Sequence, residues 1–191
     1  MLTLCRLAQI FGALGFGTFL DWSRFSRRTR GIAGWVALFV FVNVIWGGGY
    51  AFEKNTARDI PSPKQDIFDP GYTANLFLYM FYGFLDATWQ TYAYWLMGAL
   101  SNEPRKLAYF AGFYKSIQSA GAAVIWRVDA LQAPFRAIFA SSWGLCVAGL
   151  IFALPIVFMK IVETNIHKED FMTKEEAGLE KEERVANESH V

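Results

Sequence analysis

Charged residues are scarce in this sequence of 191 residues. They make up 18% of it, whereas hydrophobic residues make up 54% and aromatic residues 17%. A soluble domain has an apolar share of about 45–50% even when its glycines are counted. The composition therefore excludes an ordinary soluble domain and predicts an integral membrane protein whose main partner is the lipid bilayer.

Cysteine and histidine are also rare, with two residues of each. Cys5 and Cys146 both fall within apolar segments, so they indicate neither a disulfide framework nor a metal site. His167 and His190 stand in the polar end of the chain without the spacing of metal ligands. The sequence also has no nucleophile triad, phosphate-binding loop or dinucleotide fingerprint. We therefore expect no enzyme, no cofactor and no metal.

Neither sign of charge predominates over the whole chain, whose net charge is +1. From Lys160 onward there are nine acids and five bases, a net charge of −4, which leaves +5 for the apolar part. This balance gives no reason to expect a nucleic acid as a partner. Since the chain becomes charged and loses apolar periodicity after residue 161, we predict a transmembrane region at 1–161 and a solvated tail at 162–191.

Five long apolar segments divide the region before the tail. A helix that crosses a membrane needs about 20 mostly apolar residues, each adding about 1.5 Å. We therefore predict an all-α, multi-pass membrane protein with five transmembrane helices. These helices are expected at residues 1–20, 31–51, 72–100, 107–126 and 133–161. Gly47, Gly48 and Gly49 should loosen the end of the second helix, and Pro155 should kink the fifth.

The orientation in the membrane is predicted from one short basic loop at residues 21–30. It contains Arg24, Arg27, Arg28 and Arg30, and short loops this basic tend to stay on the cytoplasmic side. We therefore expect the loop and the tail to be cytoplasmic and residues 52–71 to face outward. A cleaved signal peptide at the start is the alternative, but no small-residue cleavage site follows the apolar run.

Two charges stand near the middle of predicted helices, Asp86 in the third and Lys115 in the fourth. Such a charge costs roughly 2.5–3.5 kcal/mol on insertion scales and usually faces a partner or an aqueous cavity. Steps of three and four residues place Tyr82 and Gln90 on the face of Asp86, and Gln118 on the face of Lys115. Two interpretations remain: a buried ion pair that fixes helix register, or a polar cavity used in transport or gating.

Several motifs resemble those of a known family. Gly17-Thr-Phe-Leu-Asp21 followed by Arg27-Arg28 is similar to the loop motif of the major facilitator superfamily. Residues 112–121, which include Lys115 and Gln118, resemble the Unc-93-like branch of that superfamily, a group typified by an ion channel regulatory protein. The same branch is indicated by Trp46-Gly-Gly-Gly-Tyr50, Tyr82-Gly-Phe-Leu-Asp86 and Trp95-Leu-Met-Gly-Ala-Leu-Ser101. The resemblance covers about residues 12–162.

Members of this superfamily have twelve helices in two halves. The resemblance implies that the five predicted helices match helices eight to twelve, so the chain would be a fragment, a truncated gene model or a shortened paralogue. Because transport needs a cavity between two halves, one copy is not expected to transport alone. A missing N-terminal half, another copy or a client membrane protein are the expected protein partners.

Two functions follow from these patterns. In the first, the chain is a transporter-like protein of major facilitator type, and Asp86, Lys115 and Gln118 line its polar cavity. In the second, it is a non-transporting membrane regulator or trafficking partner of a channel or receptor, as members of the Unc-93-like branch are known to be. The charges would then be structural, and faces of small residues would dock the client.

Overall fold

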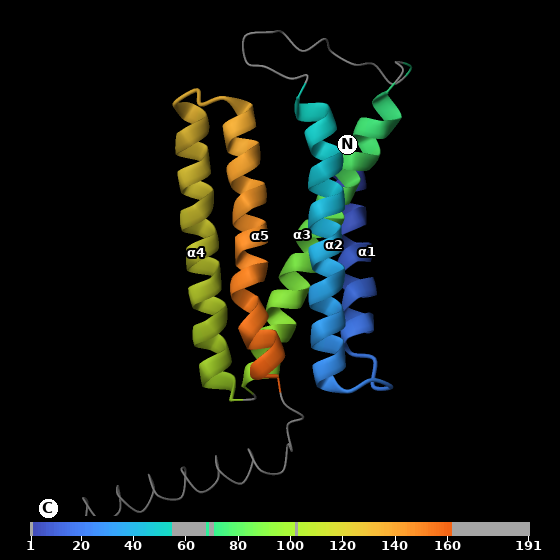
Figure 1. The fold of residues 1–191 in the computed structure, drawn as a ribbon, viewed down its shortest axis with the longest axis vertical. Helices are drawn as coiled ribbons and strands as arrows, with labels where there is room; N and C mark the ends of the chain where they lie inside the picture. Colours follow the sequence, from blue (N-terminus) through green and yellow to red (C-terminus); the bar gives the residue numbers. More distant parts are fainter. Residues whose placement is uncertain (1, 55–67, 69–70, 102, 162–191) are drawn as a thin grey trace, which may run out of the picture. The chain divides into compact units, whose positions relative to one another are not determined.

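The computed structural model describes residues 2–54, 68, 71–101 and 103–161. Within these residues the protein is entirely helical, with five helices and no strand. The helices are α1 (Leu2–Leu20), α2 (Arg27–Glu53), α3 (Tyr72–Leu100), α4 (Pro104–Ala130) and α5 (Phe135–Met159) (Figure 1). The predicted all-α fold is confirmed. The predicted tail at 162–191 and most of the predicted outer connection lie outside the described residues.

Helix α2 extends beyond its predicted bounds of 31–51 at both ends. It begins at Arg27, where the Ser26 side chain caps it by accepting a hydrogen bond from the Thr29 backbone N–H. The basic loop is therefore shorter than predicted. The expected loosening at Gly47, Gly48 and Gly49 was wrong, because α2 stays helical to Glu53. In lipid, every backbone N–H and C=O must be satisfied within the structure, which favours helix over the intrinsic preference of glycine.

The other helices lie close to their predicted positions. Helix α3 has the predicted bounds, whereas α4 is longer than 107–126 at both ends. Pro104 occupies the first turn of α4, where its missing N–H costs no hydrogen bond. Helix α5 continues through Pro155 to Met159.

Three of the described helices, α1, α2 and α5, are long and apolar enough to cross a membrane. Helices α3 and α4 have sufficient length but carry more polar residues, among them Asp86 and Lys115. Many large apolar side chains point outward, such as Phe152, which is 79% exposed. Since lipid accepts apolar surface, this exterior is typical of a membrane protein. Crossing by all five helices stays a prediction.

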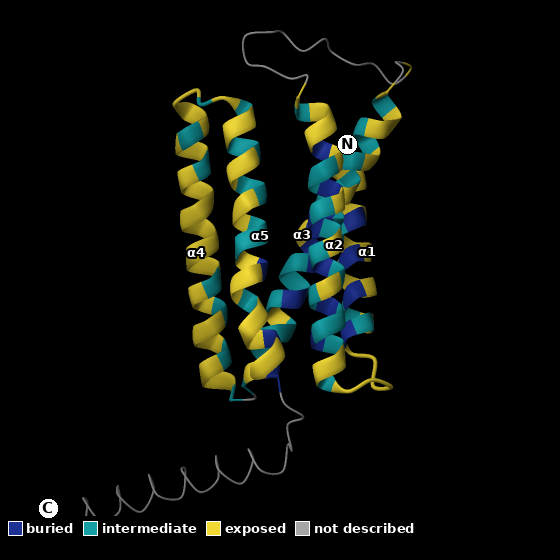
Figure 2. Ribbon diagram, viewed as in Figure 1, coloured by how far each residue is buried: buried dark blue, intermediate teal, exposed yellow. Residues whose placement is uncertain are grey.

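The best-packed part of the bundle consists of α1, α2, α3 and the inner face of α5. Helix α1 approaches α3 closely, because a Cβ atom on Gly83 would lie 2.5 Å from Cys5 Sγ. Helix α2 packs against α3 and α5. Figure 2 shows the buried residues concentrated on α1, α2 and α3. The central buried side chains are Phe16, Leu20, Leu38, Val42, Leu85, Tyr92, Leu150 and Val157.

Helix α4 is the exception in this bundle. It contacts α3 and α5, yet no residue along it is buried. In Figure 2 it is coloured almost entirely as exposed or intermediate. Lys115 therefore lies on α4, the helix that the rest of the described chain covers least.

Candidate functional site

A chain of hydrogen-bonded polar side chains connects α1, α3 and α4 across otherwise apolar helices. Its centre is Asp86, whose carboxylate accepts one hydrogen bond from Gln9 Nε2 of α1 at 3.0 Å. It also accepts from Gln90 Nε2, one turn further along α3, at 3.1 and 3.2 Å. The i, i+4 spacing of Asp86 and Gln90 puts the two side chains on neighbouring turns of one helix.

Lys115 joins this chain from α4. Its Nζ donates to Gln90 Oε1 at 2.9 Å and to Gln118 Oε1 at 2.8 Å. The same ammonium lies 5.8 Å from the ring centre of Tyr94 and 5.6 Å from that of Tyr114. Both distances are within the range of a cation–π interaction. The positive charge is thus held by two amide oxygens and two aromatic rings.

Gln90 is the link between the two charges. Its amide donates to Asp86 with the nitrogen and accepts from Lys115 with the oxygen. Within the part of the chain that the structure describes, Asp86 and Lys115 make no direct ion pair. The sequence therefore located both charges on facing helices, while the structure places one neutral amide between them.

Two members of this polar chain were missed in the sequence. Gln9 of α1 reaches Asp86, and Arg6 donates to Gln9 Oε1 at 3.2 Å. A signal was present, because Arg6 and Gln9 stand three residues apart in an otherwise apolar segment and so share a helix face. The complete polar chain is Arg6, Gln9, Asp86, Gln90, Lys115 and Gln118.

Tyr82 does not belong to this polar chain. Its ring packs edge-on against Trp46 of α2 at 5.3 Å between ring centres. The physical reason is rotation along the helix: each step of four residues turns about 40° past a full circle, so Tyr82 and Gln90 differ by about 80°. The stripe from Tyr82 to Gln90 therefore faces two different neighbours.

The polar chain lies open on the surface of the described residues. Asp86, Lys115 and Gln118 are exposed, and Gln9 and Gln90 are half-buried. It contains one acid, two bases and three amides, so it offers both donors and acceptors to a polar solute. The Asp86 carboxylate and the Lys115 ammonium are connected through the side-chain amide of Gln90.

The residues of the predicted loop motif form a separate cluster at one end of the helices. Gly17 accepts a hydrogen bond from the Asp21 N–H at 2.9 Å, which closes the last turn of α1. Arg27 donates to Gly98 O of α3 at 2.6 Å, and Arg28 donates to Phe158 O of α5 at 3.3 Å. Arg30 donates to Leu20 O of α1 at 2.6 Å.

Three arginines at the start of α2 therefore bind the C-terminal ends of three other helices. The last four carbonyls of a helix have no partner within it, and the helix dipole concentrates negative charge there. Cationic side chains satisfy both requirements. This contact explains structurally why basic residues are dense at 24–30 and holds α1, α3 and α5 to the start of α2.

Comparisons with known proteins show that this sequence is similar to UNC93-like proteins. It is 48% identical over 167 residues to an UNC93-like protein of Schizosaccharomyces pombe, covering 85% of this chain and 33% of that relative. It is 37% identical over 161 residues to UNC93-like protein 1 of Arabidopsis thaliana, covering 83% of this chain and 35% of the relative.

A further relative, a membrane protein of Schizosaccharomyces pombe, is 30% identical over 169 residues, which are 85% of this chain and 34% of that protein. The chain thus spans about a third of the length of the curated relatives it matches. No family model and no solved structure matches the sequence.

Proposed function

We infer that this chain is a membrane protein of the Unc-93-like family, and we propose that it forms part of a transporter-like protein of major facilitator type. The family rests on 48% and 37% identity to UNC93-like proteins over most of the chain. The apolar exterior of the helices agrees with a membrane location. The proposal about transport rests on one observation, the polar chain that connects α1, α3 and α4.

The argument starts from the exposure of Asp86 and Lys115. Each lies near the middle of a long helix, and each is exposed in the described chain. A charge inside a bilayer is expensive unless it faces water or protein. The face that carries the polar chain is therefore proposed to line a polar cavity, which other protein segments complete. In the major facilitator fold, such a cavity lies between two halves.

Gln90 gives this cavity a means of coupling. In the structure its amide connects Asp86 of α3 to Lys115 of α4. Protonation of Asp86 would weaken the acceptor that orients the Gln90 amide, and binding of a solute at Lys115 would compete with the hydrogen bond from Lys115 to Gln90. Because α4 has no buried residue, loss of the Lys115–Gln90 hydrogen bond would free α4 to move relative to α3. We propose that solute or proton binding is converted into helix movement in this way.

Water access tests the proposal. In a background with Cys5→Ser and Cys146→Ser, we would introduce Gln118→Cys on the polar chain and, as a control, Leu145→Cys on α5. Leu145 is 67% exposed and so faces lipid in this interpretation. A charged, membrane-impermeant thiol reagent is expected to label Gln118→Cys in membranes but not Leu145→Cys. Equal absence of labelling at both positions would contradict an aqueous cavity.

A non-transporting role as regulator or trafficking partner is the second candidate. It is favoured by a face of small residues on α5, formed by Ala140, Gly144 and Ala148, where a Cβ atom on Gly144 would meet nothing within 4 Å. Small residues let another helix approach closely. Co-purification of a channel or receptor that persists in Asp86→Asn and Lys115→Met, together with no labelling of Gln118→Cys, would favour this role.

A further inference from the structure

A cavity lies away from the polar chain, between the ends of α2 and α4 and the first turns of α5. It has a volume of about 430 Å³ and is lined by side chains from α2, α3, α4 and α5. Binding sites for small molecules commonly measure about 300–1,000 Å³. The size of this cavity therefore suits a small organic molecule rather than a bare ion.

Six of the thirteen residues that line this cavity are aromatic. Trp46 lies 5.3 Å from Tyr82 and 5.0 Å from Phe139, measured between ring centres. Trp126 of α4 and Phe135 of α5 also line the cavity. Rings of this kind attract cations through the negative faces of their π systems.

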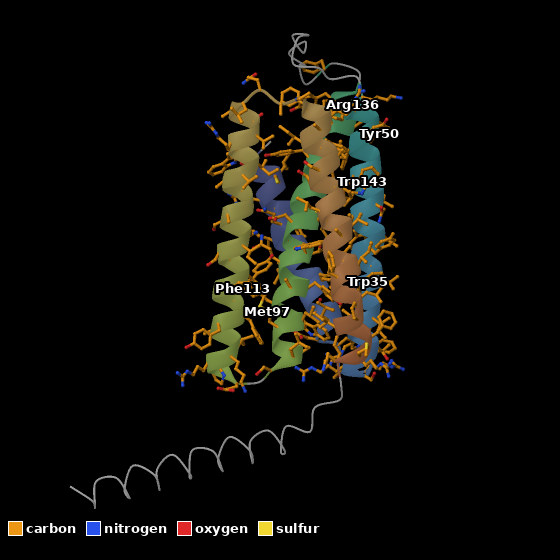
Figure 3. All side chains as sticks on the ribbon, turned by 60° about the vertical axis from the view of Figure 1, so that its left-hand side comes forward. Trp35, Tyr50, Met97, Phe113, Arg136 and Trp143 are labelled. Atoms are coloured by element: carbon orange, nitrogen blue, oxygen red, sulfur yellow. The ribbon has the colours of Figure 1, made fainter. Side chains whose placement is uncertain are left out.

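Two carboxylates, Glu53 and Asp129, are the charged residues among the lining. Lys54, Arg127 and Arg136 stand nearby in the sequence but do not line the cavity. Figure 3 shows Arg136 and Tyr50 at the upper end of the helices, above Trp143. The guanidinium of Arg136 instead donates to Lys54 O at 3.4 Å. The charged side chains that line the cavity are therefore both acidic.

The position of both acids strengthens this negative character. Glu53 is the last residue of α2, and Asp129 lies in the last turn of α4. The C-terminal end of a helix carries a partial negative charge of about half a unit. The N-terminal end of α5, which begins at Phe135, opposes this effect, but the charged side chains that line the cavity are both carboxylates.

One observation points directly to a ligand. In the described part of the chain, Glu53 Oε1 is buried and has no hydrogen-bond partner. The same is true of Trp46 Nε1. Buried polar atoms are nearly always hydrogen-bonded, and leaving one unsatisfied costs about 1–3 kcal/mol. Glu53 lines the cavity, so a turn of its side chain toward the cavity would let an ammonium group donate to this oxygen while the organic part contacts the rings. Trp46 Nε1 is itself a donor and would not pair with an ammonium group.

We propose that this cavity binds a small organic ammonium ion, with Glu53 as the group that accepts its N–H donor and Trp46, Tyr82 and Phe139 as the aromatic wall. The site shares no residue with the polar chain of α1, α3 and α4. The proposal therefore stands whether or not that chain lines a transport cavity.

The experiment compares a cation with its neutral isostere. Calorimetric titration of the purified full chain in lipid nanodiscs would measure binding of 2-phenylethylammonium and of 2-phenylethanol, with empty nanodiscs to subtract partitioning into lipid. The ammonium ion is expected to bind, and to bind at least about tenfold more tightly than the alcohol, since a charged hydrogen bond contributes about 1.5–3 kcal/mol and 1.4 kcal/mol is tenfold.

Variants then locate the site. Glu53→Gln should weaken ammonium binding about tenfold or more. Glu103→Gln is the matched control, because the Glu103 carboxylate pairs with Lys106 at 2.7 Å outside the cavity, and it should bind normally. Asp129→Asn offers a second test if Glu53→Gln does not fold. Asp86→Asn should also bind normally, which separates this site from the polar chain.

Three results would overturn the proposal. The first is ammonium binding no greater than to empty nanodiscs. The second is equal affinity for the ammonium ion and the alcohol, which would indicate an apolar cavity without selectivity for charge. The third is normal binding in folded Glu53→Gln. If binding is at the same time lost in Asp86→Asn, the cation binds at the polar chain instead.

Discussion

Helices α1 and α4 both contact α3, but they do so in opposite ways. Helix α1 buries one residue on each turn toward its neighbours, Ala8, Gly12, Phe16 and Leu20. Helix α4 buries none. Association of helices in lipid has no hydrophobic driving force and depends on close packing and hydrogen bonds. Helix α1 is therefore held by close packing, whereas α4 is held to α3 by a hydrogen bond and by contacts between partly exposed side chains.

The contacts of α4 with α3 support this difference. Lys115 donates to Gln90, and the rings of Tyr94 and Tyr114 meet edge-on at 5.7 Å between centres. Packing in a core has one favoured arrangement, but hydrogen bonds between flexible side chains can be exchanged. The comparison therefore predicts that α1 and α3 behave as one rigid unit and that α4 is the helix able to move.

The largest expected effect is on the α1–α3 contact. A Cβ atom on Gly83 would lie 2.5 Å from Cys5 Sγ and 2.9 Å from Cys5 O, so the two backbones would have to separate. Gly83→Val should lower the free energy of unfolding by about 3 kcal/mol, the upper end for overpacking. Unfolding by titration with sodium dodecyl sulfate would measure this loss.

Gly112→Val on α4 is the matched control. A Cβ atom on Gly112 would meet nothing within 4 Å, so its unfolding should change little. Equal losses in both variants would show that α4 is packed as tightly as α1 and would remove the basis of the comparison.

The next effect concerns the end of α1. Arg30→Gln removes the charged donor from Leu20 O, a contact of 2.6 Å. A hydrogen bond that involves a charge contributes about 1.5–3 kcal/mol, so the melting temperature in detergent should fall clearly. Arg28→Gln removes the same charge from the same turn, but its contact is 3.3 Å and exposed. If both variants lose equal stability, net charge rather than the cap of α1 is responsible.

A smaller effect is expected at the link between α3 and α4. In a double-mutant cycle of Gln90→Leu and Lys115→Met, the coupling should be about 0.6–1.7 kcal/mol, from the average to the largest value measured for hydrogen bonds between helices in membranes. The cycle of Asp86→Asn and Lys115→Met should give less, because Gln90 separates the two charges. Stronger coupling between Asp86 and Lys115 than between Gln90 and Lys115 would instead indicate a direct ion pair of Asp86 and Lys115.

The helices were predictable from the sequence because their number and approximate bounds follow from long apolar segments that are separated by short polar stretches. Helix α3 has the predicted bounds. The start of α2 was not predicted, because the cap by Ser26 was overlooked among arginines. The three glycines misled the prediction because propensity measured in water does not weigh the need for backbone hydrogen bonds in lipid.

The site was only partly predictable for a different reason. Periodicity places residues on a helix face but does not identify the helix opposite. Asp86, Gln90, Lys115 and Gln118 do join, but the contribution of Gln9 needed the knowledge that α1 packs on α3. The aromatic cavity was not predictable, because its lining comes from four helices whose order in space the sequence does not state.

The smallest effect should come from the exposed face of α4, and two phenylalanines allow a matched test. Phe113 of α4 is 69% exposed, whereas Phe16 of α1 is 7% exposed. In the purified chain, Phe113→Ala should change the free energy of unfolding by less than about 0.5 kcal/mol, as is usual for surface substitutions. Phe16→Ala should cost several times more, because it leaves a cavity among packed side chains.

The same pair of variants can show whether α4 is covered in its native surroundings. If another protein segment packs on α4, Phe113 becomes an interface residue and its truncation removes packing from that interface. Phe113→Ala would then be nearly neutral in the purified chain but would reduce the amount of folded protein in native membranes. Equal neutrality in both settings would mean that lipid covers this face of α4. The polar cavity would then have to be completed from the side of α1 and α3 alone.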